Sequence, residues 1–309
     1  MKIILFAHQN WGVYAVRYLA KTNHEIIRVY THPLDMDKHE KVWYDSVSVE
    51  CKKYGIEVEE KSKISNDDVE FIQKISPDVI FSIGWRRLIP KSIFEVPKYG
   101  TINLHDGLIP QYRGFAPINW AIINGETEVG LTMHFIDQSA DTGDIISQEK
   151  ITVNIKDTAF DVYKKLLEIS PKMLQDILSM MENKKISSVS QQNMKKGFFC
   201  SRRFPDDGKI NWMDDRTKIY NLIRALCDPY PNAFFYYQEK KILIKNAELV
   251  TNDSRGPSGR ICSISDDGLI VTCGTNHSTN QSLLIKLIQT DGKTMKPKEY
   301  SFKLWENLS

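Results

Sequence analysis

Residues 100–143 read GTINLHDGLIPQYRGFAPINWAIINGETEVGLTMHFIDQSADTG and contain two predicted strands that end in polar side chains. The first strand is Thr101–His105. Side chains alternate along a strand, so Asn103 and His105 project to the same side. The second strand feeds a polar loop that contains Asp141. Ligands of open α/β sheets bind beyond the carboxyl ends of the strands. We therefore expect Asn103, His105 and Asp141 to meet at that edge.

These three residue types suit acyl transfer. A carboxylate beside an imidazole fixes its tautomer and raises its basicity. An amide N–H can donate to an oxyanion as a carbonyl becomes tetrahedral. No Ser or Cys lies where the nucleophile of a triad would be, which favours direct transfer to an amine without a covalent enzyme intermediate. The alternative is a buried histidine held by a loop aspartate, with the asparagine capping the strand end.

A longer pattern surrounds these residues. It comprises Asn103-x-His105, Leu108-Ile109-Pro110-x-Tyr112-Arg113-Gly114, Pro117, Trp120, Gly125-Glu126, Gly130-x-Thr132-x-His134 and Asp141-Thr142-Gly143. The pattern resembles the signature of the formyltransferases that use N10-formyltetrahydrofolate. The resemblance implies that Asn103, His105 and Asp141 are catalytic, that this folate is the formyl donor, and that no metal is needed. The chain departs from the family at Asp106-Gly107, where small or hydroxylated residues such as Ser are common.

Composition places the chain among globular proteins of ordinary make-up. At 309 residues it is long for one domain, and 41% of its residues are hydrophobic and 26% charged. A formal net charge of +2 gives no global basic field for nucleic acid. The five cysteines form no CxxC pair, which indicates reduced thiols in a cytoplasmic protein without a zinc site. No apolar run has the length of a signal peptide or a membrane span.

The first half alternates strands and helices, which predicts a doubly wound parallel sheet of the Rossmann-like kind. Apolar runs predict buried strands. The predicted strands are Lys2–Ala7, Ile26–Thr31, Ile56–Val58, Asp78–Ile83, Thr101–His105 and Leu131–Ile136, and the predicted helices are Val13–Lys21, Val47–Tyr54 and Asp67–Ile75.

Two further loops are expected at carboxyl ends of strands. The polar turn His8–Gly12 has one glycine and no dinucleotide fingerprint, so its residues Gln9, Asn10 and Trp11 are candidates for substrate contact or for plain connection. After the strand that ends at Ile83, the family resemblance implies a pteridine pocket. Its members would be Trp85, Arg87, Leu88 and Ile89, with Ile136, Asp137 and Gln138 from the later loop. The alternatives are a solvated edge for the arginines and core packing for Trp85 and Leu88.

The second half begins with a long predicted helix from Asp157 or Thr158 to about Asn183, which Pro171 is expected to bend or split. Residues 183–200 read as a linker. Five short alternating strands follow a helix at Thr217–Leu226, and they predict a small OB-like barrel. These strands are Phe235–Tyr237, Lys241–Leu249, Gly259–Ile264, Leu269–Cys273 and Leu283–Ile288. We expect a formyltransferase catalytic domain at 1–198 and an OB-like β domain at 199–309.

The pattern R-R-x-P-D-D from Arg202 to Asp207, with the later P-x-P-x-A-F run, resembles the family branch that formylates UDP-4-amino-4-deoxy-arabinose. Guanidinium groups match phosphate geometry, so arginines are candidates for the diphosphate of the acceptor. A domain-interface salt bridge is the alternative. The candidate acceptor residues are Arg113, Gly114, Pro117, Arg202, Arg203 and Arg224.

The choice of acceptor depends on residues 32–50. The tRNA branch of the family carries a basic insertion, whereas residues 32–41 hold three acids against two lysines, and phosphate contacts dominate nucleic-acid affinity. The run Trp43–Val47 resembles the sugar-modifying branch. We expect a nucleotide-linked 4-amino-4-deoxy or 4,6-dideoxy sugar of lipopolysaccharide or surface-glycan biosynthesis, on UDP rather than dTDP, with no nucleic-acid or membrane partner. Methionyl-tRNA formylation and a non-catalytic folate-binding module are the alternatives, and a homodimer is one option for the assembly.

Overall fold

The computed structural model describes residues 1–34, 42–194, 197–250, 254–275 and 282–309, and these form two compact units. The units do not follow a single cut in the chain. Unit 1 comprises Met1–Pro117, Glu128–Thr152 and Tyr163–Arg202. Unit 2 comprises Ile118–Thr127, Val153–Val162 and Arg203–Ser309.

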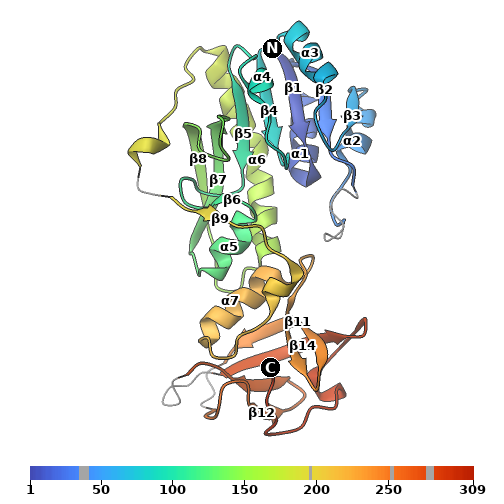
Figure 1. The fold of residues 1–309 in the computed structure, drawn as a ribbon, viewed down its shortest axis with the longest axis vertical. Helices are drawn as coiled ribbons and strands as arrows, with labels where there is room; N and C mark the ends of the chain where they lie inside the picture. The colour runs from blue at the N-terminus through green and yellow to red at the C-terminus, as the bar shows by residue number, and fades with distance from the viewer. Residues whose placement is uncertain (35–41, 195–196, 251–253, 276–281) are drawn as a thin grey trace. The chain divides into compact units, whose positions relative to one another are not determined.

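Unit 1 is built on a seven-stranded sheet with the order β3-β2-β1-β4-β5-β7-β8 (Figure 1). Five neighbouring strands are parallel, which confirms the predicted doubly wound fold, and the last two strands join it through antiparallel pairings, β7 with β5 and β8 with β7. The five parallel strands are β1 (Lys2–Ala7), β2 (Glu25–Thr31), β3 (Val58–Glu60), β4 (Val79–Ile83) and β5 (Thr101–His105), and the last two strands are β7 (Glu128–Phe135) and β8 (Ile145–Thr152).

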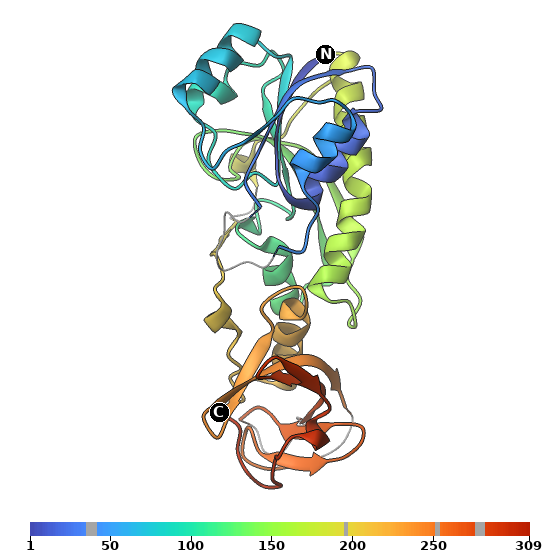
Figure 2. The ribbon, with the colours of Figure 1, turned by 90° about the vertical axis from the view of Figure 1, so that its right-hand side faces the viewer.

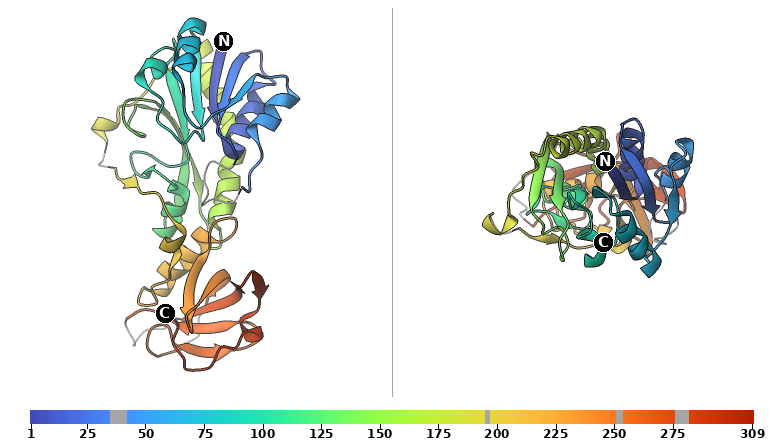
Figure 3. Two further views of the ribbon diagram at one scale, coloured as in Figure 1. Left: turned by 45° about the vertical axis from the view of Figure 1, so that its right-hand side comes forward. Right: turned by 90° about the horizontal axis from the view of Figure 1, so that it is seen from above.

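Helices cover both faces of this sheet. In Figures 2 and 3, α1 (Gln9–Leu19), α2 (Val47–Lys53) and α6 (Ala159–Glu182) lie on one face, and α3 (Asn66–Ile75) and α4 (Lys91–Phe94) lie on the other. The predicted turn at His8–Gly12 is wrong, because α1 already begins at Gln9 and the Gly12 N–H donates to the His8 carbonyl at 3.0 Å. Pro171 lies inside α6 and does not split it.

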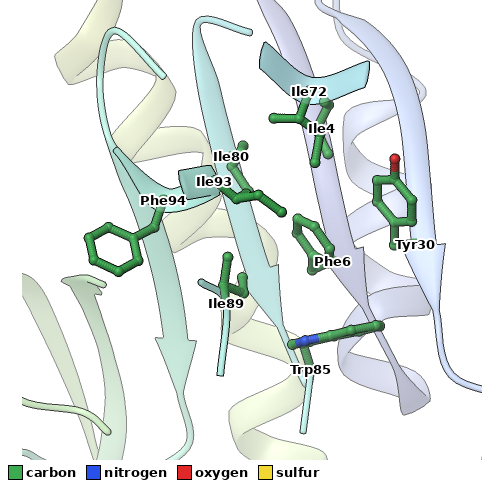
Figure 4. Packing of buried hydrophobic residues seen from close by; sticks show 9 residues of the cluster. All are labelled: Ile4, Phe6, Tyr30, Ile72, Ile80, Trp85, Ile89, Ile93 and Phe94. Carbon is green, nitrogen blue, oxygen red and sulfur yellow. The ribbon is translucent and has the colours of Figure 1, made fainter. Parts of the chain in front are cut away.

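The core under α3 and α4 fixes the carboxyl end of β4 (Figure 4). Phe6 of β1 stacks on Tyr30 at 4.9 Å and meets the edge of Trp85 at 5.2 Å. Burial of apolar surface stabilises the folded state by roughly 25 cal/mol per Å². The packed aromatic side chains therefore support the carboxyl end of β4. The cluster comprises Ile4, Phe6, Tyr30, Ile72, Ile80, Trp85, Ile89, Ile93 and Phe94.

Unit 2 contains an antiparallel sheet with the order β10-β11-β14-β13-β12, and β15 pairs with β14. The segment Trp305–Ser309 bonds to both outer strands: Ile261 donates to Glu306, and Tyr236 exchanges backbone hydrogen bonds with Ser309. This segment therefore covers the two edges that an open barrel would expose. The strands are β10 (Ala233–Tyr237), β11 (Lys240–Leu249), β12 (Ile261–Ile264), β13 (Leu269–Thr272), β14 (Ser282–Thr290) and β15 (Lys293–Met295). The five predicted strands are present, and β15 is additional.

Unit 2 also takes in two segments from the first half of the sequence. Asn119 donates through Nδ2 to the Ala225 carbonyl at 2.7 Å, and Arg224 donates to the carbonyls of Asn154 and Asp157 at 3.3 and 2.8 Å. These bonds tie both segments to helix α7. The remaining elements are α5 (Pro117–Ile123), α7 (Arg216–Leu226), the short pair β6 (Arg113–Gly114) and β9 (Phe199–Cys200), and the 3-10 helices η1 (Gln191–Asn193), η2 (Pro205–Gly208) and η3 (Pro297–Glu299).

Candidate active site

The antiparallel pairing of β5 with β7 brings two short motifs together. Asn103 pairs with His134 across the ladder, and His105 pairs with Thr132. Directly opposite residues point to the same face of a sheet. The motifs Asn103-x-His105 and Thr132-x-His134 therefore form one four-residue patch on the edge where β5 ends.

His105 is 5% exposed, and its Nε2 lies 2.7 Å from the backbone carbonyl of Tyr112. A carbonyl can only accept, so the hydrogen of neutral His105 is on Nε2. Its Nδ1 is left with a lone pair, and this nitrogen lies 3.7 Å from Asp141 Oδ1. Tyr112 has φ of +56°, a left-handed conformation that few non-glycine residues adopt. The loop after β5 thus sets the tautomer of His105.

The structure shows why position 107, where the sequence departs from the family pattern, is a glycine. A Cβ atom at this position would lie 2.9 Å from His105 Nε2 and 2.8 Å from the Tyr112 carbonyl, so any side chain would displace one of them. Thr132 Oγ1 donates to the Gly107 carbonyl at 2.7 Å and holds the loop in place. The neighbouring Asp106 is half-buried, and burial raises the pKa of its carboxyl.

Asn103 is half-buried, and its amide is oriented by His134. The His134 Nδ1–H donates to the Phe135 carbonyl at 2.8 Å, so His134 Nε2 is an acceptor. The Asn103 Nδ2 lies 3.1 Å from this nitrogen and donates one of its two hydrogens to it. Within the described part of the chain no group takes the second hydrogen, which suits an oxyanion.

Asp141 lies between the two imidazoles. Its Oδ1 is 3.5 Å from His134 Nε2 and 3.7 Å from His105 Nδ1, and its Oδ2 accepts the Gly114 N–H at 2.8 Å. Burial alone would raise the pKa of Asp141. His105, His134 and the Gly114 N–H outweigh burial and hold this pKa well below its usual range. The carboxylate is therefore ionised at neutral pH.

The segment after β4 divides between core and surface. Trp85 and Ile89 are buried in the cluster of Figure 4, whereas Arg87 is exposed and Leu88 is 69% exposed. His32 stacks on Trp85 with ring centroids 3.7 Å apart. The Trp85 Nε1–H is buried and has no hydrogen-bond partner among the described residues. An acceptor atom of a bound ligand would satisfy this donor.

The loop after β7 carries the other predicted folate contacts. Ile136 is partly buried and packs against the same cluster. Asp137 Oδ1 accepts from the Ser139 N–H at 3.0 Å and from Thr142 Oγ1 at 2.6 Å, which shapes the loop. Gln138 is exposed. Trp85 and Ile136 thus belong to one apolar cluster. Leu88 and Gln138, which are close to them in sequence, are exposed at the surface.

The predicted contacts at the end of β1 are largely occupied. Gln9 is buried with φ of +56°, and Asn10 Oδ1 accepts the Asp45 N–H at 2.8 Å. Trp11 is buried and packs edge-on against Tyr163 at 4.9 Å. Core packing accounts for the contacts of Trp11.

The candidate arginines differ in their surroundings. Arg202 is exposed, and Arg203 lies 4.7 Å from the Trp120 ring and donates to the Asp207 carbonyl at 2.8 Å. Arg224 is buried, and its donors reach Asn221 and two backbone carbonyls of unit 2. These contacts fit a structural role for Arg224.

Arg113 and Gly114 lie in β6, beside the Asp141 carboxylate, and Pro117 begins α5. Sequence reasoning leaves out three groups that the structure places here: the His134 ring, the Tyr112 carbonyl and the Gln191 side chain. The alternation of Thr132 and His134 along one strand is a signal for His134. Gln191 lies in the segment predicted as a linker and gives no such signal.

Among the described residues, no three His, Cys, Asp or Glu side chains are grouped so that they could hold a metal ion. In the same part of the chain, no helix has the length and apolar character needed to span a membrane.

The chain belongs to the formyl transferase family. The family's formyl transferase model matches residues 1–178, and the model of its C-terminal domain matches residues 204–303. The family resemblance of the sequence is thus confirmed.

A curated relative is the bifunctional polymyxin resistance protein ArnA of Wigglesworthia glossinidia brevipalpis, which is 36% identical over 274 residues. These cover 88% of this chain and 41% of that protein, so the chain spans less than half the length of this relative.

Two solved structures share the fold at 21% identity and a TM-score of 0.69. One is WlaRD, a sugar 3N-formyl transferase with dTDP and 5-N-formyl-THF, matched over 95% of this chain and 98% of that one. The other is the N-formyltransferase of Helicobacter canadensis with folinic acid and dTDP-3-aminofucose, matched over 92% and 98%.

Proposed function

We propose that this protein transfers the formyl group of N10-formyltetrahydrofolate to the amine of a nucleotide-linked amino sugar. One observation carries the proposal. The spare N–H of Asn103, the lone pair of His105 Nδ1 and the ionised Asp141 lie together at the carboxyl end of β5. A donor for an oxyanion and an acceptor for a proton are what direct acyl transfer to an amine requires.

The residues present fit a folate donor. The buried Trp85 N–H lacks a partner within the described residues, and Arg87 and Leu88 are exposed beside it in sequence. We assign the pteridine contacts to Trp85, Arg87, Leu88, Ile89, Ile136, Asp137 and Gln138. When bound, the folate supplies a formyl group activated on nitrogen. The solved structures of WlaRD and the Helicobacter canadensis enzyme contain 5-N-formyl-THF and folinic acid, which supports a folate as the formyl donor.

His105 is the proton acceptor in this proposal. Its Nδ1 takes a proton from the attacking amine, while Nε2–H stays bonded to the Tyr112 carbonyl. The resulting imidazolium has an acceptor on each side, the Tyr112 carbonyl and the Asp141 carboxylate. Asp141 Oδ1 lies on the Nδ1 side of the ring, where it can accept from the new Nδ1–H, and this contact fixes the ring.

Asn103 holds the oxyanion. An oxyanion contact from the protonated nitrogen of His105 does not fit the structure, because that nitrogen donates to Tyr112. The second Nδ2 hydrogen of Asn103 takes this role, and His134 keeps the amide nitrogen on the correct side.

The acceptor is proposed as a sugar nucleotide, with Arg113 as a contact for its diphosphate. The two similar structures contain dTDP or a dTDP-linked 3-amino sugar, whereas the sequence favours a UDP-linked 4-amino sugar. The three acids and two lysines of the count that argues against tRNA all lie within residues 35–41, which are outside the described residues. The experiment below therefore also tests methionyl-tRNA formylation and non-catalytic folate binding.

The test follows tetrahydrofolate release from N10-formyltetrahydrofolate with UDP- and dTDP-linked 3-amino and 4-amino sugars, and with methionyl-tRNA. Turnover on a sugar nucleotide and none on tRNA is the expected result. Turnover on methionyl-tRNA alone would overturn the proposed acceptor. Folate binding without turnover on any acceptor would favour the non-catalytic module.

A further inference from the structure

Gln191 is a buried amide in a segment that carries little regular structure. It opens the 3-10 helix η1 and is 6% exposed. The two residues before it are also fixed: Val189 and Ile145 exchange backbone hydrogen bonds at 2.8 and 2.9 Å, and Ser190 Oγ accepts the Gln192 N–H at 3.3 Å. The side chain of Gln191 is therefore held against the edge of β8.

The Gln191 amide binds two segments of the candidate active site, strand β6 and the loop that contains Asp141. Its Oε1 accepts from Arg113 Nε at 3.0 Å and from a terminal guanidinium nitrogen of Arg113 at 2.6 Å. Its Nε2 donates to the carbonyls of Asp141 at 3.0 Å and Gly143 at 2.6 Å. The oxygen and both hydrogens of this amide are thus used on residues next to the site.

These contacts close a ring. The residue after Arg113 is Gly114, whose N–H donates to Asp141 Oδ2 at 2.8 Å. Asp141 has φ of +55°, and the Gln191 amide holds the carbonyl of this strained residue. Conformations of this kind persist only where the surroundings over-determine them. Gln191, Arg113, Gly114 and Asp141 thus fix one another.

Gly143 restricts the loop that contains Asp141. A Cβ at this position would lie 1.9 Å from the Phe135 carbonyl, so the backbone of the loop packs directly on the end of β7. A shift of the loop away from Gln191 would change the position of the Asp141 carboxylate.

We infer that Gln191 is a positioning residue that sets both the Asp141 carboxylate and the Arg113 guanidinium, and so couples acceptor binding to proton transfer. The inference rests on the proposed function for the roles of these two groups. Gln191 touches neither the reacting atoms nor the folate in this scheme; it acts through its two ends. The side-chain oxygen of Gln191 orients the Arg113 guanidinium, and its nitrogen holds the backbone of Asp141.

Two substitutions distinguish the role of the Gln191 side-chain oxygen from that of its nitrogen. Gln191→Glu keeps an acceptor for Arg113 but removes both N–H donors, and its carboxylate faces the carbonyls of Asp141 and Gly143. Gln191→Met has similar length and removes both functions. Gln192→Met is the matched control, because Gln192 is exposed and adjacent.

We expect Gln191→Glu to lower kcat about ten- to hundredfold, the effect of one or two lost hydrogen bonds, with the KM for the sugar nucleotide within about twofold of the wild type. Gln191→Met should lower kcat similarly and also raise this KM about tenfold. Gln192→Met should change neither. Unchanged kcat in a folded Gln191→Glu protein, or equal KM effects in both Gln191 variants, would overturn the inference.

A substrate-free measurement distinguishes failure of the inference from failure of the proposed function. Carbon-13 NMR follows the titration of the Asp141 carboxyl in the folded proteins. In Gln191→Met its pKa should rise towards the ordinary carboxyl range, and in Gln192→Met it should stay low. Absence of turnover in the wild type contradicts the proposed function, whereas an unchanged Asp141 titration in Gln191→Met contradicts the inference about Gln191.

Discussion

At the scale of single residues, the chemistry depends on which nitrogen of each imidazole carries a hydrogen. The Tyr112 carbonyl leaves His105 Nδ1 free to accept, and the Phe135 carbonyl leaves His134 Nε2 free to accept. The sequence predicts that Asn103, His105 and Asp141 meet, because strand alternation and the family pattern both place them there. It cannot predict the tautomers, because the deciding carbonyl of Tyr112 depends on a left-handed backbone conformation seven residues away.

His134 provides a test of this hydrogen-bond order. His134→Leu removes the acceptor that orients the Asn103 amide, so we expect kcat to fall, by up to the roughly hundred- to thousandfold that loss of an oxyanion donor costs. The KM for the acceptor should change little. Steady-state kinetics check this, with His24→Leu as the control, since the ring of His24 lies beside Glu182 and the amino group of Met1. Wild-type kcat in His134→Leu would contradict the assigned role.

At the scale of elements, buried apolar runs were the most informative part of the sequence. Lys2–Ala7 and Thr101–His105 are strands with the predicted bounds. Lys2–Ala7 is an apolar run that buries well in a parallel sheet, whereas in Thr101–His105 two apolar residues alternate with polar ones. The start of α1 was missed because His, Asn and Gly favour turns, although the chain closes a helical hydrogen bond there. The strand Lys293–Met295 has no apolar alternation, and only its pairing with β14 defines it.

The segment Trp305–Ser309 bonds to both outer strands of unit 2, so we expect a substitution in it to lower the free energy of unfolding. Leu308 is 5% exposed, and Leu308→Ala should lower the free energy of unfolding by about 2–5 kcal/mol, the usual cost of a buried leucine truncation. Leu304 is 49% exposed in the same part of the chain, and Leu304→Ala should cost no more than about 0.5 kcal/mol. Urea unfolding followed by tryptophan fluorescence compares the two. Equal losses would show that the segment does not hold the edges.

At the scale of the whole molecule, the sequence predicts two parts but not how the chain divides between them. Composition, strand spacing and the linker suggest one boundary, whereas Ile118–Thr127 and Val153–Val162 belong to unit 2. Their membership depends on side-chain bonds such as that from Asn119 to the Ala225 carbonyl, which join residues far apart in sequence. Local patterns carry no information on such pairs. A domain boundary at 198–199 stays a prediction.

Two buried histidines of unit 1 make its stability depend on pH. Burial, with Arg86 nearby, lowers the pKa of His8 to about 3 and that of His32 to about 4, from an ordinary value of 6.5. His32 Nε2 also accepts the Arg86 N–H at 3.3 Å, a bond that protonation would break. Below pH 6.5 the unfolded chain binds more protons at these sites than the folded chain does, so the free energy of unfolding falls as pH falls.

We therefore expect the urea midpoint to decrease between pH 6.5 and pH 4.5. The double variant His8→Gln, His32→Gln should show a shallower decrease, because its unfolded state gains no protons at these positions. Midpoints measured across this range in both proteins give the comparison. A double variant that loses stability with falling pH as steeply as the wild type would show that these histidines do not control the slope.

The most direct test of formyl transfer by Asn103 and His105 is single-turnover release of tetrahydrofolate with the preferred nucleotide-linked amino sugar. Wild-type protein should transfer the formyl group, and Asn103→Ala and His105→Ala should each slow the step about a hundred- to a thousandfold while folate still binds. Near-native transfer in His105→Ala would contradict the account, because the proton of the amine would then need another acceptor.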